Sequence, residues 1–303
     1  MVFENDLKKS LILKEVTLVC FDTRSTDAAI ESMNLSMNQI HFSKSILFTK
    51  RLLYSDTLMN KANKLGIKIE FVDEINSITE YSYFILVHLE RYIKTKFCLV
   101  TQWDGWVIDS YKWNINFLNF DYIGAIWPDY SENQIGNGGF SLRSKNFLQS
   151  TKDFVLNQSH LPEPLIEDDF ICRKMRSSFE SKYKIKFPSI ELANKFSVEG
   201  NGLPTDSFGF HSMSNFHVVI RDDSYLSDFI NKLIKENFNN RESYDLTKNL
   251  LSQNRLSVAK LIIRKRYDFY GMSKKHVKLI IFFIYRKLLI KLGKTFSSSK
   301  KNS

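Results

Sequence analysis

The N-terminal third of the chain alternates between short apolar runs and longer stretches in which apolar residues recur at helical spacing. The apolar runs are rich in β-branched and aromatic side chains, which predicts buried strands at 15–21, 44–49, 67–72 and 97–102. The stretches between them predict helices at 26–39, 55–65 and 80–93. Strands that alternate with helices form βαβ units. We therefore expect an α/β fold with a mostly parallel central sheet and helices on both faces.

After residue 113 the pattern changes, and the change sets the predicted domain organisation. The elements that follow are expected to be strands at 122–127 and 138–142 and helices at 144–156 and 168–179. From about residue 224 onward only helical patterns occur. The sequence therefore predicts one α/β domain over residues 1–223 and a helical, basic extension over residues 224–303.

The positive charge of the chain is concentrated at one end. The 303 residues carry a net charge of +10, but residues 255–303 contain 14 lysines or arginines and a single acid, Asp268. That segment therefore carries +13 and the remaining residues carry −3. Because the body of the protein is mildly acidic, the composition argues against a nucleic-acid-binding function.

Cysteine usage and hydropathy predict a cytoplasmic protein. Cys20, Cys98 and Cys172 are scattered and show no C-x-x-C spacing, so buried reduced thiols are expected instead of disulfides or a zinc site. The N-terminus lacks the apolar core of a signal peptide. No uncharged apolar stretch reaches the roughly 18 residues that a membrane-spanning helix needs.

Ligands of parallel α/β sheets bind at the carboxyl ends of the strands, which draws attention to the residues that follow each predicted strand. Asp104 comes directly after the fourth strand, within the segment 102–106. A carboxylate at this position is well placed to bind Mg²⁺ or Mn²⁺ together with substrate phosphates. The alternative is a turn or helix-cap aspartate, with Trp103 and Trp106 as packing residues.

A second candidate is the glycine-rich segment 136–144, in which three of the first four residues are glycines. Glycines allow a ligand to approach the backbone closely, and Asn137 and Ser141 could hydrogen-bond a polyhydroxylated substrate. The segment matches neither G-x-G-x-x-G nor a P-loop, which excludes a standard dinucleotide or ATP loop. An ordinary glycine-rich turn that enters a strand is the alternative.

Two further segments hold side chains that could act in catalysis. Glu167, Asp168 and Asp169 stand directly before an apolar helical stretch. Acids are favoured there by the helix dipole, so capping is the alternative to a general-base role. His211 ends the segment Phe-Gly-Phe-His; such a histidine is more often structural, but a neutral imidazole can complete a site whose other ligands are oxygens.

In this order, the segments resemble the GT-A class of glycosyltransferases. In particular they resemble a bacterial family, domain of unknown function number 5672, which has glycosyltransferase-like character. The resemblance covers about residues 15–219 and rests on LVTQWDGW, NGGFSLRS, EDDFICR and FGFH. It implies a nucleotide-diphosphosugar transferase fold for the first domain.

The resemblance implies a role for each matching residue. Asp104 matches the second aspartate of the metal-binding D-x-D motif, and Gln102 stands in place of the first. His211 matches a late histidine that joins the metal or the diphosphate. Glu167 and Asp168 match an acidic pair whose aspartate is the base in inverting members, and Asp169 remains an alternative base.

The residues around the donor follow from the same resemblance. The nucleotide part of the donor is expected to lie near residues at the strand ends: Phe21, Asp22, Thr23, Arg24, Asp73, Gln102, Trp103 and Asp104. The loop that lines the donor sugar and acceptor is expected to contribute Asn137, Gly138, Gly139, Ser141 and Arg143. Of these, Arg24 or Arg143 could stabilise negative charge on the diphosphate.

The implied function is sugar transfer from a nucleotide-diphosphate donor to a glycan or lipid-linked acceptor in bacterial surface polysaccharide synthesis. A single displacement would invert the anomeric centre, and Mn²⁺ or Mg²⁺ would be the cofactor. The neutral Gln102 leaves a non-catalytic nucleotide-sugar-binding module of the same fold as the alternative.

The basic segment 255–303 mixes apolar and basic residues over helical lengths, at 255–266 and 273–294. This composition predicts contact with an anionic membrane surface, and hence a peripheral position on the inner face of the cytoplasmic membrane. The alternatives are a helical extension that packs on the body with a solvated basic face, an oligomer contact, or a site for a polyanionic acceptor.

Overall fold

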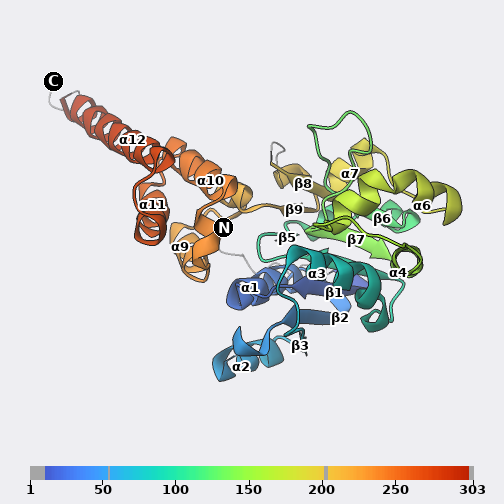
Figure 1. Ribbon diagram of the computed structural model, residues 1–303. Helices are drawn as coiled ribbons and strands as arrows, with labels where there is room; N and C mark the ends of the chain where they lie inside the picture. Colours follow the sequence, from blue (N-terminus) through green and yellow to red (C-terminus); the bar gives the residue numbers. More distant parts are fainter. Residues whose placement is uncertain (1–10, 54, 201–203, 300–303) are drawn as a thin grey trace. The chain divides into compact units, whose positions relative to one another are not determined.

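The structure, a computed structural model, describes residues 11–53, 55–200 and 204–299 (Figure 1). These residues form two compact units that meet in sequence between His211 and Ser212. The boundary predicted at residue 223 falls inside the second unit. The strands are β1 (Leu11–Phe21), β2 (Ile40–Thr49), β3 (Ile67–Phe71), β4 (Phe97–Thr101), β5 (Trp106–Val107), β6 (Tyr122–Gly124), β7 (Phe140–Ser144), β8 (Ser197–Glu199) and β9 (Gly209–His211). The helices are α1 (Thr26–Met37), α2 (Asp56–Lys64), α3 (Ile78–Tyr83), α4 (Lys145–Leu156), α5 (Glu167–Asp169), α6 (Arg176–Lys182), α7 (Ile190–Phe196), α8 (Phe216–Val219), α9 (Asp223–Asn231), α10 (Arg241–Ser252), α11 (Leu256–Tyr270) and α12 (Lys274–Ser299).

A six-stranded sheet organises the first unit, in the order β3-β2-β1-β4-β7-β6. The strands from β1 to β4 are parallel, whereas β7 runs antiparallel to both β4 and β6. The chain first adds β2 and β3 on one side of β1 and then places β4 on the other side. Such a switch point is where α/β sheets bind ligands. The prediction of an α/β fold with a mostly parallel sheet is confirmed.

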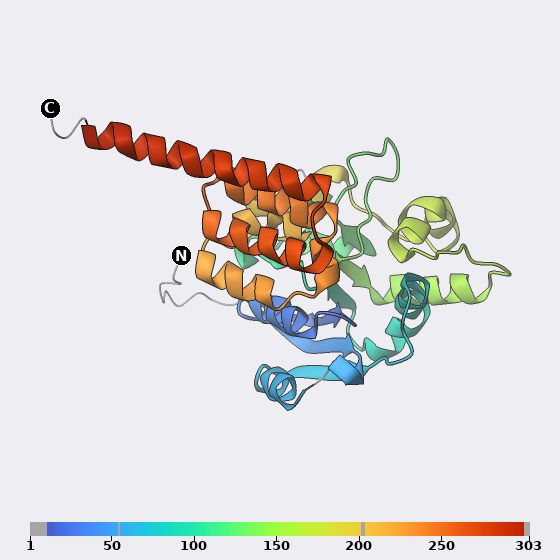
Figure 2. The ribbon, with the colours of Figure 1, turned by 60° about the vertical axis from the view of Figure 1, so that its left-hand side comes forward.

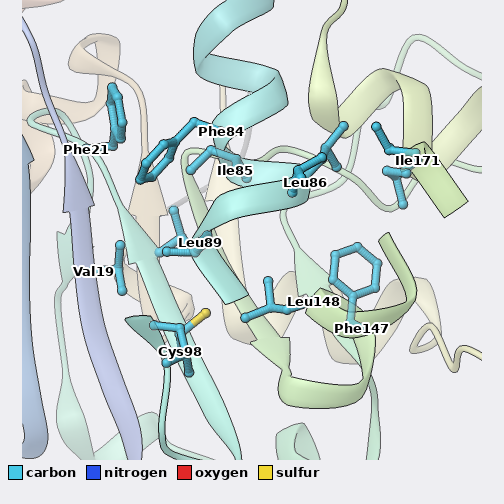
Figure 3. Close-up of a cluster of buried hydrophobic side chains, with 14 of the residues drawn as sticks. Val19, Phe21, Phe84, Ile85, Leu86, Leu89, Cys98, Phe147, Leu148 and Ile171 are labelled. Atoms are coloured by element: carbon cyan, nitrogen blue, oxygen red, sulfur yellow. The ribbon is translucent and has the colours of Figure 1, made fainter. Parts of the chain in front are cut away.

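Both faces of this sheet are buried, because alternate residues of each strand point to opposite sides. Val19 and Phe21 of β1 enter one apolar cluster, part of which Figure 3 shows, together with residues that follow α3 and residues of α4. Leu18 and Cys20 enter the other cluster, against α1, α2 and α7. The predicted cover of helices on both faces is therefore confirmed, and all three cysteines are buried free thiols, as expected.

A second, three-stranded sheet, with the order β5-β9-β8, was not predicted from the sequence. Its strands are two or three residues long, too short to show a periodic pattern. Trp106 of β5 pairs with Phe210 of β9, and their rings meet edge to face with centroids 4.6 Å apart. This pairing brings β9, and with it His211, beside the turn that follows β4.

Two predicted helices are interrupted in the structure. The helix expected at 80–93 is α3 followed by one wide π-helical turn at Phe84–His88, and the helix expected at 168–179 contains a similar turn at Phe170–Lys174. Several consecutive residues are buried in each wide turn. A regular α-helix, which rotates 100° per residue, would turn some of these side chains away from the core.

The second unit is helical, which confirms the predicted C-terminal extension. The helices α10, α11 and α12 pack against one another, and α9 packs against α11 (Figure 2). Leu246, Leu250, Ile262 and Leu279 form part of the buried interior. Among the described residues, no helix combines the length and the apolar character that crossing a membrane requires.

Candidate functional site

Asp104 lies in a tight turn at the end of β4, beside the switch point of the main sheet. The Gly105 amide donates to the Gln102 carbonyl across this turn (3.2 Å), and the Ser32 hydroxyl of α1 lies 2.8 Å from the same carbonyl oxygen. Asp104 is only 4% exposed, and its Oδ1 atom forms no well-aligned hydrogen bond with a described residue, although Nε2 of His211 lies 3.3 Å from it. An unsatisfied buried carboxylate oxygen is costly, so this atom marks a place for a ligand or ion.

His211, at the end of β9, faces Asp104. Its Nε2 atom lies 3.3 Å from Asp104 Oδ1 and 3.2 Å from Gln102 Oε1, and its Nδ1 atom lies 3.1 Å from Glu199 Oε1. Burial alone would lower the pKa of His211, but the carboxylates of Asp104 and Glu199 outweigh it and raise this pKa well above its ordinary value. The ring therefore lies between two carboxylates that favour its protonated form.

Glu199 is a site residue that sequence reasoning missed. It ends β8 and stands opposite His211 in the parallel pairing with β9. Its second carboxylate oxygen accepts a hydrogen bond from the side-chain amide of Asn137, so Glu199 joins the glycine-rich segment to the histidine. The residues around Glu199 form no motif, and only the register of a three-residue strand places it here.

The glycine-rich segment lies between the histidine and the acidic helix α5. A Cβ atom on Gly139 would lie 2.2 Å from Nε2 of His211, and one on Gly138 would lie 2.1 Å from Oε1 of Glu167. Any side chain at either position would displace one of these two groups. Asn137 has a φ of 48°, in the left-handed region that asparagine tolerates better than most residues.

A buried ion pair fastens the acidic helix to the C-terminal end of β7. Arg143 donates to both carboxylate oxygens of Glu167, at 2.8 and 3.2 Å, and both side chains are almost fully buried. The same guanidinium lies 2.9 Å from Oγ of Ser141 and 3.3 Å from the carbonyl oxygen of Gly138. Since these groups occupy Arg143, its role in the structure is to hold the loop.

The two aspartates of α5 differ in their surroundings. Asp168 accepts a hydrogen bond from the Gly138 amide at 2.7 Å, which places its carboxylate on the glycine-rich segment. Asp169 instead forms ion pairs with Arg173 at 2.5 Å and Lys174 at 2.9 Å. These two basic residues line a surface hollow together with Tyr130, Ser131, Glu132 and Asn133.

The residues after β1 approach the same edge of the sheet. Asp22 is buried, and its Oδ1 atom accepts hydrogen bonds from the amides of Arg24 (2.9 Å) and Ser25. Burial is the main cause that raises the pKa of Asp22 from 3.8 to about 6; the negative charge of Asp104 adds to the increase. The Arg24 side chain is exposed beside this carboxylate.

Other predicted site residues lie further from this group or point into the core. The ring of Phe21 packs against Tyr81 with centroids 4.9 Å apart, and Trp103 packs against the second core cluster. Thr23 is half-buried between Asp22 and Arg24. Asp73, after β3, accepts a hydrogen bond from the Arg51 amide at 2.6 Å, on the outer side of the parallel strands.

These contacts bring three predicted site residues, Asp104, His211 and Asp168, to one edge of the sheet. Asp104 and His211 face each other, and Gly139 lies against the ring of His211. The adjoining Gly138 donates its amide to Asp168. Asp168 and the Asp104–His211 pair therefore lie on two sides of one short loop.

This cluster offers some, but not all, of the ligand atoms that a divalent cation needs. Oδ1 of Asp104 and Oδ1 of Asn137 are buried and accept no hydrogen bond from any residue that the structure describes. Within the same described ranges, no three His, Cys, Asp or Glu side chains are grouped to hold a metal ion. A cation would thus be held by Asp104 and His211, with amide or phosphate oxygens completing the shell, a ligand type that suits Mg²⁺ and Mn²⁺.

The buried ion pair generates a first prediction. Arg143→Met leaves Glu167 buried without its partner, and we expect the free energy of unfolding to fall by about 3–5 kcal/mol. In Arg143→Met/Glu167→Leu, two apolar side chains replace the pair, and much of this loss should be recovered. Urea denaturation of the wild type, both single variants and the double variant measures the effect. Equal destabilisation of Arg143→Met and the double variant would contradict the assignment.

The pKa of Asp22 generates a second prediction. Its folded-state pKa is raised, so its stabilising contribution is full below about pH 3.8 and is lost as the pH rises through about 6. An asparagine at this position could accept the same backbone hydrogen bonds without a charge. Asp22→Asn should therefore be more stable than the wild type by about 1–3 kcal/mol at pH 8 and equally stable at pH 4. Thermal unfolding at both pH values tests this; a difference that does not change with pH would refute it.

Comparison with known proteins finds one sequence family whose model matches the part of the chain that carries this site. Residues 66–211 match the model of a family described as "Protein of unknown function (DUF5672)". No curated protein matches the chain. The matched range contains all four segments on which the resemblance was based, from Leu99 in LVTQWDGW to His211.

Several solved structures show a distant likeness to the chain. A glycosyltransferase involved in glycosylation of the major capsid of PBCV-1 is 12% identical with a TM-score of 0.41, and the match covers 65% of this chain and 92% of that one. GlyE of Streptococcus pneumoniae TIGR4 is also 12% identical, with a TM-score of 0.40, and the match covers 78% of this chain and 63% of GlyE. Likeness of this degree does not identify an activity. The family resemblance recognised in the sequence is confirmed over residues 66–211.

Proposed function

We propose that this protein is a glycosyltransferase that moves a sugar from a nucleotide-diphosphate donor to a hydroxyl group of an acceptor, with inversion. The observation that carries the proposal is the placement of Asp168 and the Asp104–His211 pair on two sides of one glycine-rich loop, at the switch point of the sheet. The family resemblance favours a glycan or lipid-linked acceptor in bacterial surface polysaccharide synthesis.

The donor is best accommodated along the ends of β1 and β4. The exposed Arg24 side chain can pair with a phosphate oxygen of the donor. Asp104 and His211 would hold Mg²⁺ or Mn²⁺, which when bound neutralises negative charge on the diphosphate. Asn137, whose Oδ1 atom has no described donor, is placed to meet the donor sugar or complete the same shell.

Asp168 is the candidate general base. The acceptor oxygen attacks the anomeric carbon, the bond from that carbon to the diphosphate oxygen breaks, and the acceptor proton passes to the Asp168 carboxylate. The amides of Gly138 and Asp169 each donate to one oxygen of this carboxylate, at 2.7 and 2.8 Å, and so fix its orientation. Asp169 is less suitable, because Arg173 and Lys174 already neutralise it. Attack on the face opposite the leaving group gives inversion.

Glu167 is better suited to positioning than to proton transfer. Its carboxylate is buried, and Arg143 binds both oxygens. Burial, the largest influence, raises the pKa of Glu167, whereas Arg143 acts in the opposite direction. The pair fixes α5, and thereby Asp168, against the loop.

A non-catalytic nucleotide-sugar-binding module is the second candidate, and Gln102 favours it. The neutral amide stands where the first aspartate of D-x-D is expected, and its Oε1 lies 3.2 Å from Nε2 of His211. Release of nucleoside diphosphate from a nucleotide sugar by the wild type would argue against this alternative.

The role of Asp168 leads to a third prediction. Asp168→Asn keeps the size of the side chain and an acceptor for the Gly138 amide, so donor binding should be nearly unchanged. Loss of the base should reduce turnover by about 10²–10⁴-fold. Turnover is measured as release of nucleoside diphosphate from the donor. Asp169→Asn is the matched control and should retain most activity; a fully active Asp168→Asn protein would remove Asp168 from the mechanism.

The cation site leads to a fourth prediction, tested without catalysis. Nucleoside diphosphates should raise the melting temperature more with Mn²⁺ than without it, and Asp104→Asn should abolish this difference. A ligand at a hundred times its dissociation constant stabilises by about 2.7 kcal/mol. Glu199→Gln should weaken Mn²⁺ binding by about tenfold, because Glu199 orients the His211 ring. A cation-dependent shift that survives Asp104→Asn would exclude Asp104 as a ligand.

A further inference from the structure

We propose that the outward face of α12 is a docking surface for an anionic lipid bilayer, on which the helix lies parallel to the membrane plane. The proposal concerns the second unit alone and does not depend on the transferase activity of the first. It starts from the finding that one face of α12, here called the inward stripe, packs against the second unit, whereas the opposite face is apolar and exposed.

The inward stripe fixes the rotation of α12 about its own axis. His276 and Leu279 are 2% and 1% exposed, and they pack against the helices of the second unit. Further along the helix, the guanidinium of Arg286 donates to the Ser252 carbonyl oxygen at 3.0 Å and lies 3.1 Å from Oδ1 of Asn254. These contacts hold one face of α12 against the C-terminal end of α10 (Figure 2).

The opposite face of α12 is apolar and exposed. At 100° per residue, six of its side chains fall within an arc of about 100°. Each is at least 41% exposed, and they are Val277, Ile281, Ile284, Tyr285, Leu288 and Leu292. Isolated exposed apolar residues are ordinary, but a continuous stripe of this kind marks an interaction surface.

The charges that border the stripe indicate what covers it. Lys278 and Lys291 flank the arc on its two sides, about 20° beyond its ends by the same rotation. The sequence from Lys274 to Leu292 contains six basic residues and no acid. A second copy of the helix on this face would bring lysines against lysines without an acidic partner. An anionic bilayer accepts the apolar stripe among its acyl chains and the lysines among its headgroups.

The length and composition of α12 set how it would bind. None of the described helices is long and apolar enough to cross a membrane. A helix whose apolar face is bordered by lysines instead lies in the interface, with its polar side toward water. The inward stripe stays packed on α10 and α11, so docking requires no unfolding of the second unit.

Vesicle co-sedimentation of the full chain tests the proposal. Phosphatidylcholine vesicles with and without phosphatidylglycerol are compared for the wild type, Ile281→Ser/Leu288→Ser and Lys278→Gln/Lys291→Gln. Leu52→Ser, on the first unit, is the matched control, since Leu52 is 79% exposed and lies outside the stripe. Circular dichroism checks that each variant keeps its helical content.

Binding should require phosphatidylglycerol and weaken with salt. The lysine variant should bind about fivefold more weakly for each lysine removed, and the apolar variant about tenfold or more weakly, whereas Leu52→Ser should bind as the wild type does. Equal sedimentation of all variants, or no binding by the wild type, would overturn the proposal. Light scattering that shows a wild-type dimer dissociated by Ile281→Ser/Leu288→Ser would assign the stripe to a second copy. Nucleotide-induced thermal shifts should be unchanged in that variant, so failure of this proposal and failure of the proposed activity remain distinguishable.

Discussion

The buried pair of Arg143 and Glu167 is the interaction on which the candidate site depends. Removing two charges from water is expensive, and the cost is offset only when the geometry satisfies the remaining hydrogen-bonding groups. Here Ser141 and the Gly138 carbonyl complete the shell of the guanidinium. All of these hydrogen bonds of Arg143 can therefore form only when β7, the glycine-rich loop and α5 have their native positions. It couples α5 to two segments that lie far from it in the sequence, and so it sets the position of Asp168.

Close packing makes the loop a rigid spacer between the two chemical groups of the site. Gly138 touches the Glu167 side and Gly139 touches the His211 side, and neither position has room for a Cβ atom. Two consecutive residues thus separate the candidate base from the candidate cation ligands. In the proposed reaction, a donor sugar on this loop would have its diphosphate toward Asp104 and its anomeric carbon toward Asp168, as an inverting displacement requires.

The sequence predicts the parts of the structure whose periodicity extends over many residues. The four parallel strands, the long helices and the position of Asp104 at a strand end follow from such patterns. Glu199 could not be found, because a three-residue strand has no period and its register depends on long-range pairing with β9. The exposed apolar stripe of α12 could not be predicted from the sequence either, although this helix is long. Apolar residues occur around much of this helix, so the sequence shows no single apolar face, and only the packed structure tells the covered face from the exposed one.

Gln102 is neutral at the position where the family resemblance implies an aspartate, but the site keeps a second carboxylate in Glu199. The carboxylate of Glu199 contacts Nδ1 of His211, whereas the carboxylate of Asp104 contacts Nε2 on the other side of the same ring. With the ring protonated, the carboxylates of Asp104 and Glu199 leave a net negative charge, and exchange of that proton for a divalent cation would make the cluster neutral. A carboxylate at position 102 would add a charge that this balance does not need. The neutral amide is thus consistent with a site in which a histidine–glutamate pair takes the place of one aspartate.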